Sequence, residues 1–219
     1  MTRLRDRYQT KVVPELKKAL RRENVHALPK VVKIVLNVGL SRAAKDPNVQ
    51  QTVLETLTRI TGQKPVLTKA RQSIASFKLR QGQIIGAMVT LRGKRMEEFL
   101  DKLIHVTLPR VRDFRGLRKQ AVAAGTLTIG FKEHTVFPEI RSDEVDRLHG
   151  LEVTIVTTAT RPEETLALLT ALGMPFSDTA VEEPEGMLPS ERAAQRASLA
   201  SGRAAAAKRE KAAAKKGKG

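Results

Sequence analysis

Residues 30–39 have the sequence KVVKIVLNVG, in which apolar and polar positions alternate. Ile34 and Leu36 fall on one side of such an extended chain, and Lys33 and Asn37 fall on the other. A period of two predicts a β-strand with one face buried and one face open. This strand indicates a sheet that is packed on one side only.

The same pattern analysis, applied to the sequence on both sides of this strand, predicts the remaining helices and strands. Further strands are expected over residues 64–68, 84–91, 126–131 and 151–158. Helices are expected over residues 3–22, 46–62, 94–106 and 162–172, and Pro14 should kink the first of them. Residues 70–84 and 107–125 lack a clear period and are expected to form long basic loops. The mixture predicts an α+β fold with a sheet covered by helices on one face.

Charge is the next informative feature. Residues 56–96 contain nine Lys or Arg and no Asp or Glu, and the whole chain has 40 basic against 23 acidic residues, a formal charge of +17. A folded surface normally mixes signs, so this bias predicts a polyanionic partner, either nucleic acid or an anionic membrane surface. The alternative is a solvated basic face without a partner.

Several classes of protein are made less plausible by what the sequence lacks. The chain has no cysteine, which excludes disulfides and thiolate metal sites and suits a reducing compartment. No segment approaches eighteen consecutive apolar residues, and the N-terminal twenty residues are charged throughout. We therefore expect a cytoplasmic protein that neither spans a membrane nor is secreted.

The composition changes near residue 181. Residues 1–180 carry a net charge of +13, and residues 181–219 are rich in Ala and Lys with a net charge of +4. We interpret 1–180 as the folded, RNA-binding domain and 181–219 as a flexible basic tail. The tail either adds a contact with nucleic acid or is dispensable.

Catalytic and metal-binding patterns are not apparent. The four histidines, His26, His105, His134 and His149, are widely spaced, and no phosphate-binding, zinc-protease or nucleophile-elbow motif occurs. We expect no catalytic residues, no metal site and no cofactor. An RNA-acting enzyme would need a cluster of titratable residues that the sequence does not show.

Aromatic residues are also scarce, with one Tyr, six Phe and no Trp. This favours recognition of folded RNA through phosphates and shape rather than through stacking on bases. Phe77 is the exception, because it lies between Ser76 and Lys78 in a basic segment and would need a reason to be exposed. Thr90 and Asn37 lie on the predicted polar sheet face, where they could bind ribose and phosphate groups or be ordinary polar filler.

The same stretches carry a family resemblance. They are GQKPVLTKARQS at 62–73, FKLRQG at 77–82, KIVLNVG at 33–39, VTLRG at 89–93, PRVRDFRGL at 109–117 and FPEI at 137–140. Together they resemble the bacterial ribosomal protein L-five family, over about residues 1–178. The tail departs from the short C-terminus usual in that family.

The resemblance implies a curved, mixed or antiparallel sheet and a place in the central protuberance of the large ribosomal subunit. It implies binding to 5S rRNA, and the residues assigned to this contact are Asn37, Gln63, Lys64, Thr68, Thr90 and Arg92. It implies a loop that contacts peptidyl-site tRNA, and the residues assigned to it are Arg71, Ser73, Phe77, Lys78 and Arg80.

The resemblance also implies an intersubunit bridge to small-subunit protein S-thirteen, formed by Arg112, Pro138, Glu139, Arg141 and Asp143. Further implied partners are 23S rRNA and neighbouring large-subunit proteins associated with 5S rRNA. A free regulatory RNA- or DNA-binding module remains the rival from another class, and co-sedimentation with large subunits would distinguish the two.

Overall fold

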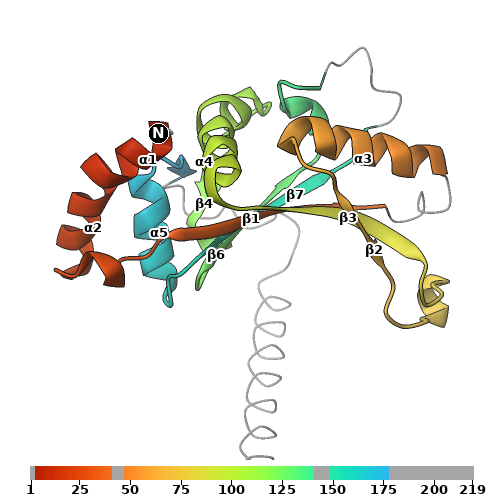
Figure 1. Cartoon of the computed structure of the whole chain (residues 1–219), viewed down its shortest axis with the longest axis horizontal. Coiled ribbons are helices and arrows are strands. Elements are labelled where there is room, and N and C mark those ends of the chain that lie inside the picture. The colour runs from red at the N-terminus through yellow and green to blue at the C-terminus, as the bar shows by residue number, and fades with distance from the viewer. Residues whose placement is uncertain (1–2, 41–46, 141–147, 178–219) are drawn as a thin grey trace, which may run out of the picture. The chain divides into compact units, whose positions relative to one another are not determined.

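A six-stranded antiparallel sheet organises the chain (Figure 1). The computed structural model describes residues 3–40, 47–140 and 148–177. The strands of this sheet are β1 (Val31–Gly39), β2 (Val66–Lys69), β3 (Ile84–Leu91), β5 (Val122–Ala123), β6 (Thr126–Phe131) and β7 (Leu151–Thr157). Their spatial order is β2-β3-β1-β7-β6-β5, and each neighbouring pair is antiparallel. The predicted α+β class is confirmed.

The alternating pattern of β1 determines which face is buried. β1 lies between β3 and β7, and Ile34 is in register with Leu91 on one side and Ile155 on the other. All three side chains are fully buried. Burying such a side chain contributes about 1.5–3 kcal/mol, so three adjacent strands hold the centre of the sheet in a single register.

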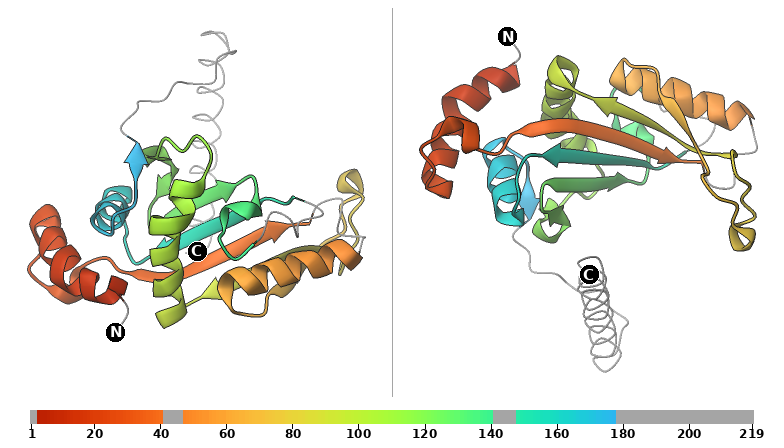
Figure 2. Two further views of the ribbon diagram at one scale, coloured as in Figure 1. Left: turned by 90° about the horizontal axis from the view of Figure 1, so that it is seen from above. Right: turned by 60° about the horizontal axis from the view of Figure 1, so that its bottom comes forward.

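Two helices cover this apolar face (Figures 1 and 2). They are α3 (Pro47–Thr61) and α4 (Gly93–Lys102), and α4 continues through a π-helical turn (Leu103–Thr107) and a 3-10 turn (Leu108–Arg110). Each helix turns an apolar stripe toward the sheet, with Leu57 and Leu100 fully buried. Gly62 ends α3 with a φ of 65°, which other residues rarely adopt. The opposite face of the sheet has no helical cover within the described residues, as the sequence predicted.

The predicted N-terminal helix is continuous but irregular. It consists of α1 (Arg3–Arg7), a π-helical turn (Tyr8–Val12) and α2 (Val13–Leu20). The π-helical turn lies directly before Pro14, whose ring cannot donate a hydrogen bond and crowds the preceding turn. α2 packs against α5 (Pro162–Ala171), and Arg22 Nη2 donates to Glu164 Oε1 over 2.6 Å.

Both segments predicted to be long loops contain regular structure. Residues 70–83 form a hydrogen-bonded hairpin with a 3-10 turn (Ala75–Phe77). Within 107–125 lie β5 and β4 (Leu117–Arg118), and β4 pairs in parallel with β8 (Phe176–Ser177). Two-residue strands are too short to produce a visible period, and the partner of β4 is nearly sixty residues away in sequence. Further 3-10 turns cover Val25–Ala27, Lys119–Ala121 and His134–Val136.

Some sequence predictions fall on positions that the structure does not describe. These are the helix start at Asp46, the bridge residues Arg141 and Asp143, and the proposed tail at 181–219. Among the described residues, no helix is both long and apolar enough to span a membrane.

Candidate nucleic-acid interface

The uncovered face of the sheet, called the open face below, gathers polar and small side chains from five strands. Strand alternation and register place the following residues on it: Lys33, Val35, Asn37, Val66, Thr68, Met88, Thr90, Thr126, Thr128, Glu152, Thr154 and Val156. Six of these twelve residues carry a hydroxyl or an amide group, and four are apolar. The open face can therefore exchange hydrogen bonds with a partner over several adjacent strands.

Two contacts preorganise the open face. Asn37 Nδ2 donates a hydrogen bond to Glu152 Oε2 over 3.2 Å, between neighbouring strands β1 and β7. The hydroxyl oxygens of Thr128 and Thr154 are 3.2 Å apart across β6 and β7. Because Asn37 and Glu152 are exposed, their remaining hydrogen-bonding groups are available to solvent or to a partner.

The six residues assigned to 5S rRNA are only partly brought together. Asn37, Thr68 and Thr90 lie on the open face, and exposed Arg92 continues its row directly after β3. Gln63 and Lys64 do not lie on the sheet, because β2 begins at Val66 rather than at residue 64. 

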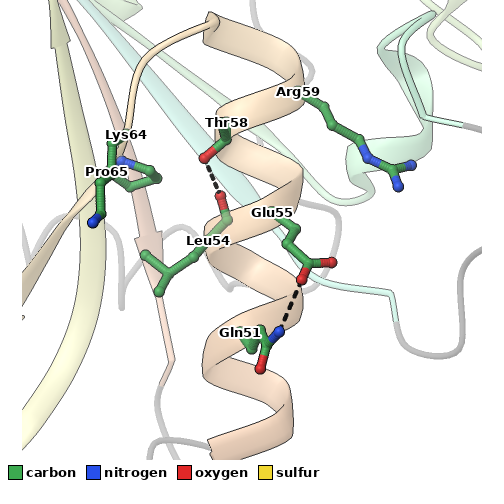
Figure 3. Close-up of a pocket in the computed structure, with 7 residues that line it drawn as sticks. All are labelled: Gln51, Leu54, Glu55, Thr58, Arg59, Lys64 and Pro65. Atoms are coloured by element: carbon green, nitrogen blue, oxygen red, sulfur yellow. Dashed lines mark hydrogen bonds between the residues drawn. The ribbon is translucent and has the colours of Figure 1, made fainter.

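These two residues belong instead to the turn between α3 and β2. Gln63 N donates to Thr61 Oγ1 there over 3.2 Å. Lys64 lines a groove beside α3 (Figure 3). The predicted strand start at Lys64 was therefore wrong, because Pro65 lacks the backbone N–H that a ladder requires.

Residues 70–83, called the basic hairpin below, project from the end of β2 and β3 (Figure 1). Ile74 and Leu79 each donate a backbone hydrogen bond to the other over 3.1 Å, and Ala70 N donates to Gln83 O over 2.8 Å. Ser73 Oγ accepts a hydrogen bond from the backbone N–H of Gln81 over 2.9 Å. The segment thus has a defined backbone rather than the irregular loop expected from its sequence.

The tip of the basic hairpin exposes an apolar ring among cations. Phe77 is 72% exposed. Lys78 follows it in the left-handed conformation, with a φ of 53°. Arg71 and Arg80 are exposed on the two arms. The four assigned side chains other than Ser73 therefore point away from the core.

The residues assigned to an intersubunit contact have different surroundings. The side chain of Arg112 is 97% exposed, and Pro138 is exposed as well. Glu139 forms an ion pair with Lys102, with 2.5 Å between Oε1 and Nζ. Arg141 and Asp143 lie outside the described residues. Glu139 therefore fixes this segment to the helix α4 through Oε1, and its other carboxylate oxygen, Oε2, is buried.

The base of the same segment is held by two histidines. The rings of His134 and His149 stack with centroids 3.9 Å apart and planes 6° from parallel, and the backbone N–H of His149 donates to His134 Nδ1 over 3.3 Å. Burial, and to a lesser extent the neighbouring His134, lower the pKa of His149 to about 4. Burial also lowers the pKa of His134. Both rings are therefore neutral at pH 7.

Comparison with known proteins identifies the family. The ribosomal protein L5 family model matches residues 24–80, and the model for the C-terminus of the same family matches residues 84–176. The chain belongs to the ribosomal protein L5 family. The resemblance inferred from the sequence is thus confirmed.

Individual relatives agree with the L5 family models. The chain is 49% identical over 178 residues to the large ribosomal subunit protein uL5 of Halothermothrix orenii, covering 81% of this chain and 99% of the relative. It is 53% identical over 175 residues to uL5 of Syntrophotalea carbinolica, covering 80% and 95%. It is 52% identical over 177 residues to uL5 of a Roseiflexus species, covering 80% and 98%.

Membership of the L5 family makes the chain a structural rather than a catalytic protein. Over residues 3–40, 47–140 and 148–177, no group of three or more His, Asp or Glu side chains could hold a metal ion. The groups that the open face presents are hydrogen-bonding, charged and apolar side chains.

Sequence reasoning missed the part of the open face that β6 and β7 contribute in this L5-family chain. Glu152, Thr154 and Thr128 were not assigned to it, although the alternation of their strands was recognised. Their position depends on β7 pairing with β1, which no local pattern specifies. The polar residues at alternate positions of residues 126–131 and 151–157 were the available signal.

Proposed function

We propose that the open face of the sheet binds 5S rRNA and that the chain thereby helps attach this RNA in the central protuberance of the large ribosomal subunit. Membership of the L5 family already makes the chain a structural constituent of that subunit, and so an rRNA-binding part of the cytoplasmic translation machinery. The proposal concerns which RNA is bound and by which surface.

The observation that carries the proposal is the convergence of Asn37, Thr90 and Arg92 on the open face, which no helix of the described residues covers. Asn and Thr side chains can hydrogen-bond ribose 2′-hydroxyls, and Arg can bind phosphate. Thr90 and Arg92 also belong to the stretch 56–96, which carries nine basic residues and no acid. Shape and backbone contacts suit a folded RNA, and the open face offers no aromatic ring for stacking.

The basic hairpin is the second proposed contact. Its hydrogen-bonded arms hold Arg71, Lys78 and Arg80 away from the core, where they can neutralise phosphates of peptidyl-site tRNA. The basic surface as a whole also suits 23S rRNA. Since the hairpin projects beyond the open face (Figure 1), we expect the 5S rRNA and tRNA contacts to be separable by mutation.

The third proposed contact is an intersubunit bridge to small-subunit protein S-thirteen. It would use exposed Arg112 and Pro138, with Glu139 positioning the segment through its ion pair with Lys102. The ion pair between Glu139 and Lys102 supports this assignment, because it fixes the segment to the folded core and so reduces the ordering cost of binding.

We propose that residues 1–180 recognise the RNA and that residues 181–219 are auxiliary to RNA binding. The family models end at residue 176, and the relatives match about four fifths of this chain but nearly all of their own length. Equal 5S rRNA affinity of residues 1–180 and of the full chain would support the division. Binding by the full chain alone would make the tail the main RNA contact.

A salt-titrated binding assay with 5S rRNA tests the main proposal. Affinity of the full chain should fall steeply as salt rises, because each neutralised phosphate releases a counterion. The double variant Asn37→Ala, Thr90→Ala should bind about tenfold more weakly, the effect of losing one or two hydrogen bonds of about 1 kcal/mol each. Thr58→Ala on α3 is the matched control. A flat salt dependence, or equal loss in the control, would contradict the proposal.

A further inference from the structure

The strand β2 forms one edge of the sheet. In the described part of the chain it pairs with β3 alone, so its outer side presents backbone N–H and C=O groups to the surroundings. The side chain of Val66 at its start is 63% exposed. An exposed edge of this kind is a template for an additional strand.

A groove of about 300 Å³ lies beside this edge, between α3 and the turn that enters β2 (Figure 3). Its floor is apolar, because Leu54 of α3 points toward Pro65. The polar groups on its α3 side are engaged within the helix: Thr58 Oγ1 donates to Leu54 O over 2.7 Å and Gln51 Nε2 to Glu55 Oε1 over 3.0 Å. The groove therefore offers a place for an apolar side chain.

The charges around the edge restrict what can bind there. Lys64 and Lys69 stand at its two ends and are exposed, and no acid occurs between residues 56 and 96. A second copy of the chain would bring the same lysines against each other, so self-pairing is disfavoured. An acidic partner would gain from both lysines.

We propose that the β2 edge and the groove together bind an extended, acidic segment of another protein of the large subunit. The segment would pair with Val66–Lys69 as an added strand, place an apolar side chain between Leu54 and Pro65, and bring acidic residues to Lys64 and Lys69. Alternate side chains of an added strand point to the α3 side, as the groove requires. RNA is the less favoured occupant: Arg59 and Lys64 line the groove, but Glu55 also lines it, its floor is apolar, and it has no aromatic ring on which a base could stack.

The absence of cysteine from the chain makes the test direct. Gln51→Cys lines the groove, and Thr52→Cys is the matched control on an exposed neighbouring position of α3 that does not line it. Each full-length variant is labelled with a photoreactive maleimide, incorporated into large subunits, irradiated, and analysed by mass spectrometry. The expected adduct from Gln51→Cys is a peptide of another subunit protein that contains Asp or Glu next to an apolar residue.

A second substitution examines whether the groove itself is used. Thr58→Arg, combined with Gln51→Cys, fills the groove from an exposed position and should lower the adduct yield about tenfold, the factor expected for losing one well-packed anchor. An unchanged urea midpoint shows that the chain still folds. The proposal would be overturned if no adduct formed, or if Thr52→Cys gave an equal yield. It would also be overturned by an adduct with rRNA, with a second copy of this chain or with a basic peptide. This proposal depends only on the chain being part of the large subunit. If the open face proved not to bind 5S rRNA, the crosslinking result at the β2 edge would still stand.

Discussion

Replacing Glu152 with Gln should strengthen binding to 5S rRNA. Glu152 is the only carboxylate of the open face within the described residues, and it lies beside Asn37 in the register of β1 and β7. RNA phosphates placed against this face would be repelled by its charge. Gln keeps an oxygen that can accept the hydrogen bond from Asn37 Nδ2, so the change removes the charge while preserving the local geometry.

The size of the effect follows from the strand spacing. Neighbouring strands lie about 4.8 Å apart, so a phosphate bound at Asn37 would be roughly 7 Å from the carboxylate. Two unit charges at that distance repel by about 0.6 kcal/mol in water and by about 2 kcal/mol at an effective dielectric constant of about 20. Affinity at low salt should therefore rise about three- to thirtyfold, and the gain should shrink as added salt screens the charges.

Filter binding or fluorescence anisotropy with labelled 5S rRNA measures this change. The control is Glu98→Gln, which makes the same charge change on α4, on the helical side of the sheet. It should alter affinity less than twofold. The reasoning would be refuted if Glu152→Gln weakened binding, or if the two variants strengthened it equally.

Three further predictions follow from the packing and the exposed surface. In the wild-type chain the pKa of His149 is about 4 when folded and 6.5 when unfolded, so the unfolded state takes up the proton first and stability should fall as the pH drops from about 6.5 to about 4. The substitution His149→Gln should flatten this pH dependence in thermal unfolding. An unchanged slope would count against the stacked pair with His134. Phe137→Ala should cost about 3–5 kcal/mol in urea unfolding, because the ring is fully buried and packs against Phe99 and Phe131; a loss below about 1 kcal/mol would be inconsistent with that packing. Phe77→Ala should leave the urea midpoint and the 5S rRNA affinity unchanged and weaken tRNA binding, and a shifted midpoint would show that the ring is part of the core after all.

Local patterns were sufficient to predict most of the fold. The alternation around Ile34 and Leu36 correctly gave β1 and its buried face, because a half-buried strand imposes a period of two on its sequence. Helix ends at Gly62 and Gly173 were also recognisable, since both adopt a positive φ. The two-residue strands β4 and β8 were missed because their pairing depends on contacts far apart in sequence.

The candidate interface was only partly predictable for the same reason. Asn37 and Thr90 could be placed on one face by alternation within their own strands. Glu152 could not be placed beside Asn37 without knowing that β7 neighbours β1. The stacking of His134 on His149 likewise joins residues fifteen positions apart, and it depends on how the chain returns after β6 rather than on any motif.

Site-specific crosslinking from the open face tests the central claim most directly. Thr128→Cys lies at an exposed position of the open face that is not an assigned RNA contact, and Glu98→Cys lies on the helical side, in a chain with no other cysteine. Each labelled full-length variant is bound to 5S rRNA and irradiated. We predict efficient crosslinks to 5S rRNA from Thr128→Cys and few from Glu98→Cys, whereas crosslinks mainly from Glu98→Cys would show that the RNA lies against the helices and not against the open face.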